Sequence, residues 1–128
     1  MMMMLRATSK LLPQSRIAFM FSNIPLSDAK YRSMWLDINT RIVDKVSTLE
    51  FIDDIDNDSD VIKLTVDNKT IVINSHMASK QVWYSSPVSG PKKFDVDNVE
   101  SNIWKDRNND ELFDTLEKDL MKLEINKA

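Results

Sequence analysis

VIKLTVDNKTIVIN, residues 61–74, is the stretch that decides the fold. In residues 61–66 apolar and polar side chains alternate, which is the period of a β-strand that buries one face. Asp67, Asn68 and Lys69 supply a turn, and residues 70–74 return as a second strand. The stretch therefore predicts an antiparallel β-hairpin.

Further short strands follow this hairpin. Residues 80–85, KQVWYS, again have a period of two. Val82 and Tyr84 are expected on one face of the strand, and Gln81, Trp83 and Ser85 on the other. After a loop around Gly90, residues 92–96 and 102–105 read as two more strands. The middle of the chain thus predicts a run of antiparallel strands.

Amphipathic helices are predicted on both sides of this run. In residues 27–49 the apolar side chains recur in steps of three and four, at Tyr31, Met34, Trp35, Ile38, Ile42, Val46 and Leu49. Ser27 is its predicted N-cap. In the second helix Asn108 is the predicted cap, with Glu111 completing a capping box, and Leu112, Phe113, Leu116, Leu120 and Leu123 are the buried stripe. This order predicts an α+β fold, a two-layer sandwich with both helices on one face of an antiparallel sheet and the other face wet.

Charge is distributed unevenly along the 128 residues. The chain has a net charge of −3, but residues 1–23 carry +3 and no acid, which leaves −6 for the remainder. A basic, hydroxyl-containing start with an apolar side is typical of an organellar transit peptide. A secretory signal and a plain basic tail are the alternatives. We expect residues 1–23 to be a mitochondrial-type transit peptide and residues 24–128 to be one domain.

Composition excludes many activities. The chain has no cysteine, one histidine (His76) and one glycine (Gly90). Disulfides, thiolate metal sites, the usual zinc hydrolase pattern and glycine-rich phosphate loops are therefore ruled out. The acidic body disfavours nucleic-acid binding. The uncharged run 17–27 has 11 residues, too few to cross a bilayer, which takes about 20. We assign no catalytic residue and expect no contact with membranes.

Five aspartates fall within residues 53–60. Their spacing is similar to part of a calcium loop, but the glycine and the bidentate glutamate of an EF-hand are missing. Carboxylates are hard ligands that suit iron(III), calcium or manganese. No histidine or cysteine lies near these aspartates in the sequence, so protein ligands alone do not complete a metal site and affinity should be modest. A charged face kept for solubility is the alternative.

KQVWYSSPVSGPKKFD, residues 80–95, closely resembles the signature of the frataxin family. Residues 70–74 and the order of helix, acidic strand, meander and helix are also similar, and the resemblance covers roughly residues 26–123. It implies a monomer that takes part in iron–sulfur cluster assembly in the mitochondrial matrix. Such a protein binds Fe²⁺ or Fe³⁺ weakly, docks on the complex of cysteine desulfurase and scaffold protein, and accelerates sulfur transfer. A weak ferroxidase or iron-storage protein and a generic acidic interaction domain are the alternatives.

The resemblance also assigns residues to these roles. The iron ridge would comprise Asp28, Asp37 and Asp44 on the first helix, and Asp53, Asp54 and Asp56 on the first strand. The docking face would comprise Asn74, Gln81, Trp83, Ser85 and Lys93. An outward tryptophan suits such a face because aromatic residues dominate binding hot spots. His76 is expected to be a plain surface residue. The first helix departs from the family pattern because Arg32, Arg41 and Lys45 lie among its few carboxylates.

Overall fold

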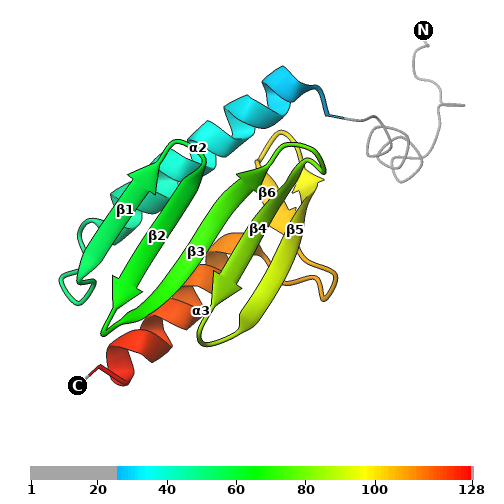
Figure 1. Cartoon of the computed structure of the whole chain (residues 1–128). Helices are drawn as coiled ribbons and strands as arrows, with labels where there is room; N and C mark the ends of the chain where they lie inside the picture. Colours follow the sequence, from blue (N-terminus) through cyan, green and yellow to red (C-terminus); the bar gives the residue numbers. More distant parts are fainter. Residues whose placement is uncertain (1–25, 128) are drawn as a thin grey trace, which may run out of the picture.

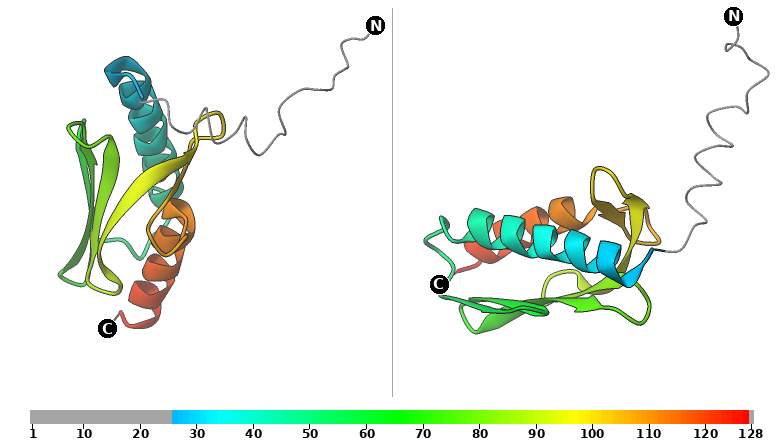
Figure 2. Two further views of the ribbon diagram at one scale, coloured as in Figure 1. Left: turned by 90° about the vertical axis from the view of Figure 1, so that its right-hand side faces the viewer. Right: turned by 90° about the horizontal axis from the view of Figure 1, so that it is seen from above.

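The structure, a computed structural model, describes residues 26–127. Two helices lie side by side on one face of a six-stranded antiparallel sheet within this part of the chain (Figures 1 and 2). The elements are α2 (Asp28–Val46), β1 (Asp54–Asp58), β2 (Val61–Val66), β3 (Lys69–His76), β4 (Gln81–Ser86), β5 (Gly90–Asn98), β6 (Ile103–Lys105) and α3 (Leu112–Ile125). The strands follow one another across the sheet in chain order. The α+β sandwich is confirmed, whereas the proposed transit peptide lies outside the described residues.

The core lies between the sheet and the two helices. Its helical side is the predicted stripe of α2 together with the leucines of α3, and its sheet side is the inward row of each strand. Trp35 and Trp104 are almost fully buried, with 0% and 1% of their surface exposed. Neither helix of residues 26–127 combines the length and apolar character needed to span a membrane.

The predicted hairpin is closed by the tight turn between β2 and β3. Asp67 and Asn68 have φ angles of 54° and 68°, and Val66 pairs with Lys69 across the turn. Positive φ at both central residues matches the right-handed twist of the strands, and Asn and Asp tolerate this region better than most residues. The turn therefore sets the register between β2 and β3.

Some boundaries differ from the sequence prediction. Helix α2 ends at Val46 rather than at residue 49, although Leu49 still packs on the core. The N-cap of α3 is Glu111 and not Asn108: the Glu111 carboxylate accepts hydrogen bonds from the N–H groups of Phe113 and Asp114. Asn108 lies in the preceding loop, where its N–H donates to Asp106. The capping-box pattern was wrong because this loop closes on Asp106 instead of starting the helix.

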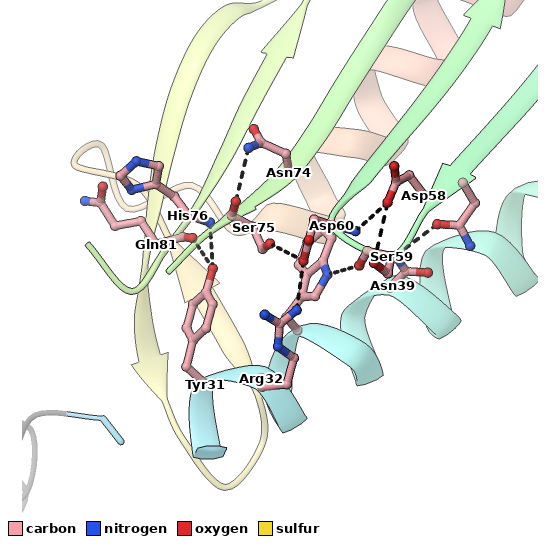
Figure 3. Close-up of polar contacts among 12 residues, drawn as sticks. Tyr31, Arg32, Asn39, Asp58, Ser59, Asp60, Asn74, Ser75, His76 and Gln81 are labelled. Atoms are coloured by element: carbon pink, nitrogen blue, oxygen red, sulfur yellow. Dashed lines mark hydrogen bonds and ion pairs between the residues drawn. The ribbon is translucent and has the colours of Figure 1, made fainter. Parts of the chain in front are cut away.

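Helix α2 is tied to the strands by polar contacts at its sheet side (Figure 3). The Tyr31 hydroxyl donates to the carbonyl of Gln81 and accepts from the N–H of His76. Burial raises the pKa of this hydroxyl. Trp35 Nε1 donates to the carbonyl of Ser59, in the turn between β1 and β2. These contacts fix the helix relative to β1, β3 and β4.

Candidate functional surfaces

The outer face of the sheet, away from the helices, carries the predicted docking residues. The strand register places Asn74 of β3 opposite Trp83 of β4, and Trp83 opposite Lys93 of β5. Val82 and Tyr84 are buried beneath this face, whereas Trp83 is half-buried and Ser85 is exposed. The alternation predicted for residues 80–85 is therefore confirmed.

Trp83 is held by its neighbours from both sides of β4. The His76 ring of β3 stacks on the indole with 3.7 Å between centroids and 10° between planes. From β5, Lys93 Nζ lies 4.8 Å from the indole centroid, a favourable cation–π contact. Trp83 Nε1 donates to Gln81 Oε1 at 3.0 Å. The indole is thus fixed in one position although it is partly open to solvent.

Hydrogen bonds extend this arrangement. Gln81 Oε1 also accepts from Ser79, and Gln81 Nε2 donates to Asp95 on β5 at 2.9 Å. His76 Nδ1 lies 2.7 Å from the same Ser79 hydroxyl. His76 is therefore more than a plain surface residue, because it connects Trp83 to this network. We call the set Asn74, His76, Gln81, Trp83, Ser85 and Lys93 the Trp83 face.

A second group of side chains lies along β1, at the edge of the sheet. Asp54, Asp56 and Asp58 alternate with Ile55 and Asn57. Ile55 packs against the core, and Asn57 accepts a hydrogen bond from Asn39 of α2. The three aspartates consequently project from the outer face, where all three are exposed. We call Asp54, Asp56 and Asp58 the acidic edge.

Asp53 differs from Asp54 and Asp56 because its carboxylate already accepts hydrogen bonds. One carboxylate oxygen accepts from the backbone N–H of Asp67 at 2.7 Å, and the other from Lys127 Nζ at 2.6 Å. The hydrogen bond from Asp67, followed by that from Lys127, holds the pKa of Asp53 below its usual range. Asp53 thus links the start of β1 to the end of α3.

The predicted helical acids do not join the acidic edge. Asp28 pairs with Lys80 at 2.7 Å, and Asp37 accepts a hydrogen bond from Asn102 in the turn before β6. Asp44, seven residues after Asp37, is exposed on that side of the helix. The side of α2 nearest β1 carries Arg32 and Asn39 instead.

Arg32 neutralises part of the charge between α2 and β1. Its guanidinium lies 2.8 Å from Asp60 and keeps the pKa of that carboxyl below its usual range. Within residues 26–127 no three acidic or histidine side chains gather closely enough to hold a metal ion. Metal binding at the six predicted aspartates stays a prediction.

These features define a class of protein: a two-layer α+β domain whose open sheet face carries a connected set of aromatic and polar side chains. The family model described as a frataxin-like domain matches residues 24–124. The chain therefore belongs to the frataxin family.

Curated relatives match over shorter stretches. The chain is 44% identical over 66 residues to mitochondrial frataxin of Dictyostelium discoideum, covering 51% of this chain and 33% of the relative. It is 42% identical over 52 residues to mitochondrial frataxin of Arabidopsis thaliana, covering 40% and 27%. The chain thus spans about a third of the length of the curated relatives it matches.

Solved structures match over more of the chain. Frataxin from Psychromonas ingrahamii superposes with a TM-score of 0.67 at 21% identity, covering 76% of this chain and 90% of that one, and supports the fold. Trimeric frataxin from Saccharomyces cerevisiae, described as complexed with ferrous, superposes with a TM-score of 0.59 at 29% identity. That match covers 88% of this chain and 97% of the yeast chain.

Proposed function

We propose that this protein is an iron-binding accessory factor of mitochondrial iron–sulfur cluster assembly. Its Trp83 face docks on the complex of cysteine desulfurase and scaffold protein and accelerates sulfur transfer. Its acidic edge holds iron weakly and offers it for delivery to the same complex. Docking and iron binding thus occupy different parts of one sheet face.

The held position of Trp83 is the observation that carries the docking role. A half-buried indole that stacks on His76 and has Lys93 Nζ 4.8 Å from its centroid is ordered before any partner arrives. Ordering a side chain in advance reduces the entropy lost on binding. Tryptophan is also enriched among residues whose truncation costs most at interfaces. Membership of the frataxin family supports the choice of partner.

The iron role is supported by donor chemistry and by one relative. The carboxylates of Asp54, Asp56 and Asp58 are hard oxygen donors on an exposed edge. Because no three such groups converge within residues 26–127, water must complete the coordination of any bound ion. The 29% identical yeast frataxin is described as complexed with ferrous. Weak, salt-sensitive binding follows from this open arrangement.

The mitochondrial location is supported by the basic residues 1–23 and by the names of the relatives, both mitochondrial frataxins. The matrix is the compartment that we propose. Fusing residues 1–23 to a fluorescent protein tests this directly. Uptake by organelles and shortening of the fusion are expected, and a fusion that stays in the cytosol would contradict the assignment.

The docking role is tested by adding the protein to a desulfurase–scaffold complex and measuring sulfide production. We expect stimulation by the wild type, and at least a tenfold larger amount of Trp83→Ala for the same effect, because hot spots cost about 2 kcal/mol or more. Lys69→Glu, at the exposed first residue of β3, is a matched control that should stimulate normally. Absence of stimulation by the wild type would refute the proposed function.

Slow oxidation of iron(II) is the second candidate, and the ferrous complex of the yeast relative favours testing it. Oxygen consumption after addition of iron(II) should be measured for the wild type and for the Asp54→Asn, Asp56→Asn double variant. Oxygen uptake that disappears in the double variant would support this activity. Uptake no faster than that of iron(II) in buffer would exclude it.

A further inference from the structure

A hollow of about 680 Å³ opens on the Trp83 face and continues past β5 to the loop that follows β6. Its sheet side is lined by Asn74, Trp83, Ser85 and Lys93, and its far side by Arg107 and Asn108. Neither Arg107 nor Asn108 belongs to the predicted docking residues. The hollow therefore extends the Trp83 face onto a loop that the sequence did not assign.

The hollow has an unbalanced positive charge. Lys92, at its wall, lies 3.5 Å from the buried carboxylate of Asp106 and is thereby compensated. Lys93 and Arg107 form no ion pair among residues 26–127, and Lys93 Nζ lies over the Trp83 ring. Two uncompensated cations around one hollow stand out in a chain of net charge −3. They favour a negatively charged occupant.

The loop that carries Arg107 is closed on itself. Asp106 Oδ1 accepts from the N–H groups of Asn108 and Asp110, both at 2.9 Å. The Asp106 N–H donates to the carbonyl of Asp110, and its side chain is only 4% exposed. Arg107 therefore stands on an ordered backbone, so less freedom is lost when its guanidinium binds a ligand.

We propose that this hollow receives an acidic segment of the partner protein, whose carboxylate binds Lys93 and Arg107 while its flanking residues pack on Trp83. The proposal rests on the docking role above. Arginine binds carboxylates through paired hydrogen bonds. A segment fits better than a free anion, because the indole offers apolar surface and Asn74 and Ser85 can bond a backbone. The hollow is also as large as a typical pocket for a drug-sized ligand.

The charge recognition is tested without the partner complex. Two blocked pentapeptides are titrated into the full chain: one contains a glutamate and an aspartate, and the other the corresponding amides. The backbone and side-chain N–H resonances of Trp83 and Arg107 are followed by NMR. We expect saturable shifts with the acidic peptide and affinity at least about tenfold lower for the amide peptide. Equal affinity for both, or shifts confined to the helices, would overturn the proposal.

Variants complete the test. Arg107→Glu should weaken binding of the acidic peptide at least about tenfold, while Lys69→Glu, with the same charge change at the start of β3 and outside the hollow, should weaken it less than about twofold. Both variants should keep the wild-type NMR dispersion, because both side chains are exposed. Equal losses of affinity in the two variants would show that only the net charge of the protein matters, and would refute the site.

The partner complex separates this inference from the function on which it rests. If the wild type stimulates the desulfurase and Arg107→Glu needs about tenfold more protein than Lys69→Glu, both stand. If Arg107→Glu and Lys69→Glu stimulate like the wild type, the docking role stands and the acidic-segment site is wrong. If the wild type gives no stimulation, the docking role fails, and the peptide titration alone decides the chemistry of the hollow.

Discussion

The acidic edge and the Trp83 face lie on the same side of one sheet, yet they are organised in opposite ways. Asp54 and Asp56 are exposed and have no side-chain partner within residues 26–127. Around Trp83, by contrast, His76, Gln81 and Lys93 each contact the indole. An ordered set of side chains suits one specific protein partner, whereas loose carboxylates suit exchangeable cations. The experiments below test whether this division holds.

The largest expected effect is on stability, and it should separate a tryptophan of the core from the tryptophan of the Trp83 face. Trp104→Ala removes a buried indole and should cost about 3–5 kcal/mol in the free energy of unfolding. Trp83→Ala removes an indole at the surface and should cost about 1 kcal/mol. Urea denaturation of both variants provides the comparison. If the two losses were equal, Trp83 would have to be counted as part of the core.

The network around Trp83 should contribute measurably to stability, and the acidic edge should not. Gln81→Ala removes hydrogen bonds to Trp83, Ser79 and Asp95, and we expect a loss of about 1 kcal/mol. Asp56→Ala should change stability by less than about 0.5 kcal/mol, because the side chain is exposed and repulsion from the other aspartates is offset by Lys63 opposite it on β2. Urea denaturation at low salt measures both changes. A larger loss for Asp56→Ala would show that the edge is structurally organised after all.

A smaller effect is expected on iron binding, which should be stronger at the acidic edge than at the acidic residues of α2. Iron(II) added without oxygen should broaden the amide signals of Asp54 and Asp56 first, and those of Asp37 and Asp44 on α2 later, because the helical acids do not join the acidic edge and Asp37 is already bonded. The Asp54→Asn, Asp56→Asn double variant should bind iron about threefold more weakly. An Asp37→Asn, Asp44→Asn control should bind like the wild type. The reverse result would move the iron site to α2.

The smallest expected effect is on the pH dependence of stability below neutral pH. The pKa of Asp53 is lowered by its hydrogen bonds from Asp67 and Lys127, and that of Asp60 by Arg32. The unfolded chain therefore takes up protons first as the pH falls below about 4, and the stability from these contacts is lost. Stability curves between pH 7 and pH 3 should be shallower for Asp53→Asn and for Lys127→Gln than for the wild type. Unchanged slopes would mean that the link between β1 and α3 does not persist in solution.

Local patterns predicted the helices, the strands and the face on which each side chain lies, because each of these depends on a short period. Alternation in residues 80–85 was enough to place Trp83 outward over buried Val82 and Tyr84. The stack of His76 on Trp83 was missed because it depends on the register between β3 and β4. The hydrophobic period within one strand does not determine that register. The pairing of His76 with Gln81 across that hairpin, once known, makes the contact evident.

The acidic residues show a second limit of the sequence. A helical period shows that Asp37 and Asp44 share a face, but not which neighbour that face meets. The structure turns Asp37 toward Asn102 and presents Arg32 to the turn after β1. The capping error at Asn108 has the same origin, because the closed loop around Asp106 competes with the helix for those residues.

The hydrogen bonds of the Tyr31 hydroxyl couple the Trp83 face to the packing of α2 on the sheet. This hydroxyl joins α2 to the backbone of His76 and Gln81, whose side chains form part of the Trp83 face. A molecule in which α2 has detached from the sheet loses both hydrogen bonds beneath that face, so a partner that requires the face binds only completely folded molecules. Conversely, partner binding stabilises the folded state. A partner present at a hundred times its dissociation constant would stabilise the folded chain by about 2.7 kcal/mol, which protects bound molecules from proteases that attack open ones.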